Sequence, residues 1–174
     1  MTAVTLLKII LSIPIGIGLI YPLLQPDAGG GILAELQIFG PVGSFVAIII
    51  FLLLVFFYAR DLVNTLQLVA PASRKASPNS VWWMFVLPYN FIEDFFIIAN
   101  VAKSLEAEAV SNPALGGFRS FGMLSGLGWC SAQVISLIPH AVGSIAGLVA
   151  ILCWIWHWRF IRRVNHALLS SHSS

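Results

Sequence analysis

Four long apolar runs dominate the pattern of hydrophobic and polar positions along the chain. Each is close to the roughly 20 residues that a helix needs to cross the hydrocarbon core of a bilayer. They lie at about residues 6–24, 41–59, 121–138 and 141–158. The link between the last two is little more than Pro139 and His140, so these helices should form an antiparallel hairpin. The sequence therefore predicts an all-α membrane protein with four transmembrane helices.

A fifth apolar segment, at about residues 81–108, is patterned differently. It carries Pro88, Asn90, Glu93 and Asp94 in its middle, where a membrane span is expected to be apolar. On a helical wheel most of its polar residues fall within about half of the circumference, and apolar residues take the other half. A preceding helix cannot continue through Pro88 without a kink. The pattern predicts a short apolar dip, a break, and then an amphipathic helix that is re-entrant or lies in the membrane interface.

The positions of lysine and arginine distinguish this prediction from a five-span topology, because cytoplasmic loops are enriched in both. If the fifth segment crossed the bilayer, Lys103, Arg119 and the three C-terminal arginines would lie outside, with only four cations inside. If it does not cross, all nine cations lie on one side. Residues 25–40, which contain no Lys or Arg, then form an outside loop. We expect a bacterial inner-membrane protein with both termini in the cytoplasm.

Composition supports a single integral membrane domain, residues 1–174. The chain is 59% hydrophobic and only 9% charged, and its mean hydropathy is +0.93. It therefore has too few polar residues to cover a soluble domain. The formal net charge of +2 reflects cations that flank apolar runs, as orientation alone requires. No nucleic-acid partner is predicted.

The acid pair Glu93 and Asp94 is the main candidate for chemistry. These are the only acids in an apolar context, and intramembrane ionisable residues are functional candidates by default. With Asn90 they form a possible proton or cation site. The alternative is structural: Asn90 caps the helix that follows Pro88, and Glu93 completes a capping box. The sequence alone favours the structural role.

Other reactive residues give no sign of a cofactor or an enzyme. His140 and His157 stand 17 positions apart, about 25 Å at the helical rise, so they cannot share one iron. Cys130 and Cys153 lie at different expected depths, which fits apolar packing better than a disulfide or a metal site. The chain has no glycine-rich phosphate loop, nucleophile elbow or HExxH motif. We predict no cofactor, no metal and no catalytic residues.

Two further groups of residues indicate packing and lipid contacts. Small residues four positions apart allow another helix to approach closely, and at least one such pair is expected to meet a different helix or subunit. Cations that follow an aromatic belt are expected to meet anionic lipid headgroups. The helix-packing residues are Gly122, Gly126, Gly143 and Gly147, and the lipid-facing cations are Arg159, Arg162 and Arg163.

Four short motifs lie between about residues 77 and 169. They are Ser77-Pro78 before an apolar run, the Pro88-Tyr89-Asn90 break, Ser104-Leu105 followed by Glu108, and Trp154-Ile155 followed by Trp158-Arg159. In these motifs the chain resembles a loose group of bacterial multi-pass membrane proteins of no known activity. The resemblance implies a multi-pass architecture and no particular chemistry. Glu93 departs from the group, in which an aromatic residue is expected at this position.

Function is predicted mainly from what the spans lack. They carry few buried charges of the kind that pathways and redox centres use, and no internal repeat suggests an inverted-repeat transporter. We expect a non-catalytic accessory or scaffold subunit of a larger membrane complex, with lipids, other membrane subunits or a second copy as partners. The alternative is a small proton- or cation-coupled channel or transporter that uses Glu93 and Asp94. A third hypothesis is a lipid-binding or membrane-shaping protein.

Overall fold

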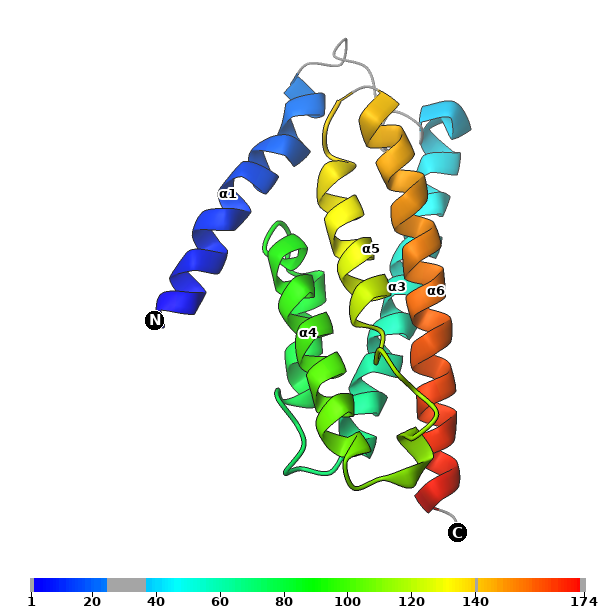
Figure 1. The fold of residues 1–174 in the computed structure, drawn as a ribbon. Helices are drawn as coiled ribbons and strands as arrows, with labels where there is room; N and C mark the ends of the chain where they lie inside the picture. Colours follow the sequence, from blue (N-terminus) through cyan, green and yellow to red (C-terminus); the bar gives the residue numbers. More distant parts are fainter. Residues whose placement is uncertain (1, 25–36, 140, 173–174) are drawn as a thin grey trace.

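All regular secondary structure in the computed structural model, which describes residues 2–24, 37–139 and 141–172, is helical. This confirms the all-α prediction. Most of the predicted outside loop, residues 25–36, lies outside the described residues. Helices α3, α5 and α6 pack together, and α4 packs on α5 and α3 (Figure 1). The elements are α1 (Ala3–Leu24), η2 (Gln37–Phe39), α3 (Gly40–Leu68), η3 (Pro78–Phe85), α4 (Asn90–Ala109), η4 (Pro113–Leu115), α5 (Met123–Ile135) and α6 (Ala141–His172).

Among the described residues, α1, α3 and α6 are long and apolar enough to cross a membrane. Helix α5, in the region of the predicted span 121–138, has 13 residues and is about 20 Å long at the helical rise. The hydrocarbon core is about 30 Å thick, so α5 alone is shorter than a span. Its start is set by Gly122, whose φ of 76° is left-handed. After Ile135 the chain continues in tighter turns, with Ile138 N–H donating to the Ile135 carbonyl.

Two of the spans continue past their apolar parts as single helices. Helix α3 reaches Leu68, as its helical pattern beyond Arg60 suggests, and α6 extends the predicted span 141–158 to His172. Large apolar side chains on α1 and the first part of α3 are exposed, as expected for a lipid-facing surface. From Tyr58 onward one face of α3 is buried. The protein core therefore lies at the end of the bundle where α6 ends.

The fifth apolar segment begins and ends at that same end of the bundle (Figure 1). The Lys75 N–H donates to Ser104 Oγ at 2.8 Å, and the Ala70 N–H donates to Glu108 Oε2 at 3.0 Å. These bonds tie the incoming chain to the C-terminal half of α4. Helix η3 packs against both α3 and α4, so the segment goes in along η3 and returns along α4.

The orientation of α4 differs from the one that the helical wheel predicts. Glu93, Asp94 and Glu108 were expected on a polar, membrane-surface face, yet all three are buried, as are the apolar Phe91 and Ile98. The reason is that α4 has neighbours on several sides, because it contacts α1, α3, α5 and η3. A helix enclosed in this way buries residues from both halves of its wheel.

Close packing of α5 depends on Gly126. A Cβ atom at this position would overlap Ile98 of α4 and lie 3.0 Å from Nε2 of His157. Gly126→Ala should therefore destabilise the fold by about 1–3 kcal/mol, the range of an overpacked core. Thermal unfolding of the purified protein in detergent measures this loss. Gly117→Ala is the matched control, because no atom lies within 4 Å of its added Cβ, and equal effects of the two changes would contradict the packing.

Candidate functional site

Glu93 lies in the first turn of α4 and Asp94 follows it, but the acid pair is not a helix cap. The residue before the helix is Tyr89, and no side chain caps it. The Asn90 N–H donates to the Val86 carbonyl at 2.8 Å, and the Glu93 N–H donates to the Tyr89 carbonyl at 3.0 Å. The predicted capping box is therefore wrong. Its physical reason is that backbone carbonyls of the preceding break already accept the N–H groups that a cap would satisfy.

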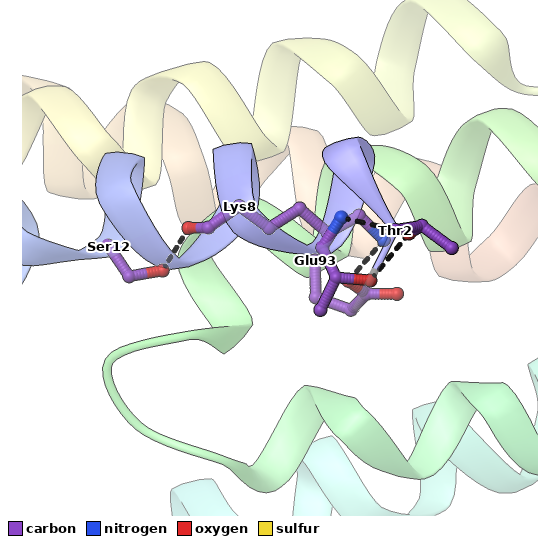
Figure 2. A network of polar contacts seen from close by, with 5 residues as sticks. Thr2, Lys8, Ser12 and Glu93 are labelled. Atoms are coloured by element: carbon purple, nitrogen blue, oxygen red, sulfur yellow. Dashed lines mark hydrogen bonds and ion pairs between the residues drawn. The ribbon is translucent and has the colours of Figure 1, made fainter.

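Glu93 is instead paired with Lys8 of α1. The Lys8 ammonium lies 2.6 Å from Glu93 Oε2, and the two side chains are only 13% and 10% exposed. The same ammonium stands 4.0 Å from the centre of the Phe96 ring. Figure 2 shows Lys8 reaching from α1 to Glu93, while the Ser12 hydroxyl donates to the Lys8 carbonyl one turn further on. The two partners are 85 positions apart in the chain.

Asp94 has no such partner. Its side chain is 1% exposed, and neither carboxyl oxygen accepts or donates a hydrogen bond within the described residues. Oδ1 of Asn90, four positions earlier and hence on the same helix face, is also buried without a partner. Asp94 lies outside the three candidate spans. Burial raises the pKa of its carboxyl well above the usual value, and the nearby Glu93 charge raises it further.

A buried tyrosine and a buried histidine join α3 to α6. The Tyr58 hydroxyl of α3 is 2.8 Å from Nδ1 of His157 on α6, and both residues are buried. Gly126 leaves the space that the His157 ring fills. The sequence assigned His157 no role, because its partner is on a helix far away in the chain.

Further polar pairs join α3 to α6 beyond Tyr58. The Trp158 indole N–H donates to Asp61 Oδ2 at 2.6 Å, and the Thr65 hydroxyl donates to Asn165 Oδ1 at 2.7 Å. The Asn165 amide in turn donates to the Asp61 carbonyl at 2.9 Å. These groups satisfy one another, so they hold the two helices in one register rather than offering a binding site.

The four glycines predicted to support helix packing are all buried, and the contacts found at them lie within the chain. Gly122 packs on Phe160 and His157, and Gly126 on Ile98 and His157. Gly143 meets the backbone of the turn that precedes α6. Their close approach therefore serves α4, α5 and α6 of one molecule. Gly147 of α6 completes the set.

The remaining predicted residues lie apart from the acid pair. Arg159, Arg162 and Arg163 are exposed on the last turns of α6, with Arg162 Nε 4.0 Å from Asp61 Oδ2. His140 lies outside the described residues. In the part of the chain that the structure describes, no three His, Cys, Asp or Glu side chains gather as metal ligands. The structure thus brings together Asn90, Glu93 and Asp94 on α4 and adds Lys8, which sequence reasoning did not assign to a site. The buried Tyr58–His157 pair was likewise not predicted.

This arrangement has the chemistry of a proton or monovalent-cation site. It contains one ion pair, one unpaired carboxyl group and one amide oxygen without a donor. A carboxyl oxygen binds protons and hard cations alike. Lys8 is the residue whose signal could have been found in the sequence, because a lysine in the second turn of an apolar helix has to meet a partner or leave the membrane.

The unpartnered carboxyl should make the stability of the protein depend on pH. Below about pH 4 Asp94 is neutral in both the folded and the unfolded chain. Above that pH the unfolded chain releases the proton more readily, because the folded-state pKa is raised, and stability falls as pH rises toward that pKa. Asp94→Asn cannot ionise. Thermal unfolding should therefore show that the stability of this variant rises relative to that of the native protein as the pH is raised from about 4.5 to about 7.

The matched control for this prediction is Asp61→Ala. It leaves the Trp158 indole N–H without its acceptor and should lower stability by about 1–3 kcal/mol. A constant difference between Asp94→Asn and the native protein across the pH range would contradict the assignment of a raised pKa to Asp94.

No protein-family model matches the chain, and no curated protein or solved structure is significantly similar to it. The resemblance to bacterial multi-pass proteins therefore stays a prediction from short motifs. What the structure supports is a chain with three candidate membrane-spanning helices and a shorter apolar helix.

Proposed function

We propose that this protein is a small proton- or cation-coupled channel or transporter in which Asp94 is the binding group. One observation carries the proposal: the Asp94 carboxyl is 1% exposed, and both of its oxygens lack hydrogen-bond partners in the described structure. A buried polar group without a partner is costly, so a site that retains one needs a functional reason. Proton relays and ion pathways are the usual reason within membrane proteins.

Two groups of polar side chains support the proposal. The Lys8–Glu93 pair stands next to Asp94 in the chain, with side chains that are 13% and 10% exposed. The Tyr58 hydroxyl bonds to Nδ1 of His157, and these two groups can exchange a proton between oxygen and nitrogen. The structural alternative, in which the acids only cap α4, has lost its support because the cap is not formed.

We further propose how the chain lies in the membrane. Helices α1, α3 and α6 cross it, α5 with its flanking turns forms a fourth crossing, and the segment from η3 to α4 is re-entrant from the cytoplasmic side. Support comes from the hydrogen bonds that tie both ends of this segment together and from the cations around them. Both termini then face the cytoplasm of a bacterial inner membrane.

An accessory or scaffold role is the second candidate. The observation that favours it is the low burial of α1, whose span is only 11% buried within the chain. This apolar surface can meet lipid or a helix of another subunit. The accessory role is tested by identifying proteins that co-purify in mild detergent. Enlarging Gly122 or Gly126 is not a suitable test, because it would disturb the fold of the protein itself. A lipid-binding role rests on the exposed Arg159, Arg162 and Arg163.

Ion flux in liposomes tests the leading proposal. Purified protein is reconstituted with a pH-sensitive dye or a Na⁺- or K⁺-sensitive dye inside the vesicles, and a membrane potential is imposed. The native protein should carry flux, and Asp94→Asn should abolish it because the binding carboxyl is gone. Glu106→Gln, at an exposed acid on the same helix, is the matched control and should retain flux. Absence of flux in the native protein, or persistence in Asp94→Asn, would refute the proposal.

Single-cysteine labelling tests the topology. In a background without Cys130 and Cys153, cysteines at Ser77 and Ser111 should react with an impermeant thiol reagent only after the cells are lysed. A cysteine at Gly30, in the predicted outside loop, should react in intact cells and serves as the control. Reaction of the Ser111 variant in intact cells would place a fifth crossing between the two positions.

A further inference from the structure

We propose that the Lys8 ammonium is a tethered counter-ion of the acid site, and that a free proton or monovalent cation reaches Glu93 and Asp94 when α1 carries Lys8 away. The inference rests on the proposed function and names its regulation. Helix α1 is then a movable element that closes the site from one side, and the occupant that it competes with is a small cation of single positive charge.

The first argument is the position of the ion pair. Lys8 binds Glu93, the residue next to the unpartnered Asp94, at 2.6 Å. An ammonium group carries the same charge as a monovalent cation. It also donates hydrogen bonds to the carboxylate oxygens that would bind such a cation. The charged and titratable groups around it are Lys8 of α1, Tyr89 of the break, and Glu93 and Asp94 of α4.

The second argument is that helix α1 is held by fewer contacts than the other long helices. Among the described elements it packs mainly on α4, whereas α3 and α6 pack on each other and on further elements. Two glycines approach other elements closely: Gly16 meets Pro88, and Gly18 meets Leu137. Beside Gly16 lies an open pocket of about 280 Å³, which Ile9, Ser12 and Ile13 line together with Pro88 and Tyr89. Elements with few buried contacts open at low free energy, so α1 can leave without disturbing the α3–α6 frame.

The third argument is electrostatic. Separating Lys8 from Glu93 leaves two uncompensated charges in a mostly buried place, which is unfavourable. The separation becomes easier when another cation, or a proton, takes the position of the ammonium at Glu93. Undocking of α1 and occupation of the site are therefore linked, because each favours the other.

Disulfide formation can report the docking of α1. A Cβ atom added at Gly16 lies 3.9 Å from Cβ of Pro88, within the range of about 3.5–4.5 Å that a disulfide needs. Gly18 and Leu137 form a second pair, at 3.6 Å, which separates docking from any effect of replacing Pro88. Both pairs, G16C/P88C and G18C/L137C, are made in the background without Cys130 and Cys153.

Lys8→Gln should slow disulfide formation at G16C/P88C by about tenfold or more, as expected for a close charge pair. The swapped variant K8E/E93K restores opposite charges and should recover most of the rate. The oxidant is dissolved oxygen with a copper catalyst, at the same concentration in every variant. Raising NaCl or KCl should slow the reaction in the native background and not in Lys8→Gln, with choline chloride as the ionic-strength control. Lowering the pH slows thiol oxidation in every variant because the thiolate is the reactive species, so the expected result is a larger slowing in the native background than in Lys8→Gln. An unchanged rate in Lys8→Gln, or no effect of any cation together with equal slowing by pH in the two backgrounds, would overturn the inference.

Flux measurements complete the test. Formation of either disulfide should suppress flux, and reduction should restore it, because α1 is then held on the site. Retention of flux by both oxidised forms would overturn the inference even if Asp94→Asn abolishes flux. If no form carries flux, the proposed function fails, and the disulfide rates alone decide whether Lys8 exchanges with cations.

Discussion

The fold depends on the register between α3 and α6, which polar side chains fix in an otherwise apolar contact. Tyr58 pairs with His157, Asp61 with Trp158 and Thr65 with Asn165, in the same order along both helices. Apolar packing alone tolerates sliding, whereas a buried donor that slides away from its acceptor loses its hydrogen bond without gaining water. These pairs therefore set a frame on which the other helices are placed.

The frame explains why α4 holds its acids inside. Helix α5 joins α6 through the tight hairpin, and Gly126 brings it close to both His157 and Ile98 of α4. Bonds from Lys75 and Ala70 then fix the far end of α4. With the contact at Gly126 and the bonds from Lys75 and Ala70 in place, α4 cannot rotate to expose its acids to water. Asp94 is buried because the rest of the segment is fixed, not because its own environment favours a carboxyl group.

Length and hydropathy were sufficient to predict the three long helices, and the distribution of lysine and arginine predicted the segment that returns to the same end of the bundle. The length of α5 was not predictable in this way, because it depends on the left-handed Gly122 and on the hairpin turn. The capping role was predicted from local spacing alone, and it failed because backbone carbonyls of the preceding break accept the first N–H groups of the helix. The partner of Glu93 is instead a residue 85 positions away in the chain. A helical wheel also carries no information about how many neighbours a helix has. The contacts of Asp94 were therefore beyond local sequence reasoning.

Charge balance gives the acid site its chemical character. Lys8 contributes one positive charge and Glu93 one negative charge, so the site is neutral while Asp94 keeps its proton. Release of that proton leaves a net negative charge in a place with almost no water, beside a second carboxylate. Loss of the proton is consequently most favourable when a cation arrives at the same time. Under the proposed function, this constraint favours an exchange in which a cation enters as the proton leaves, and the position of the Lys8 ammonium then controls access to the site.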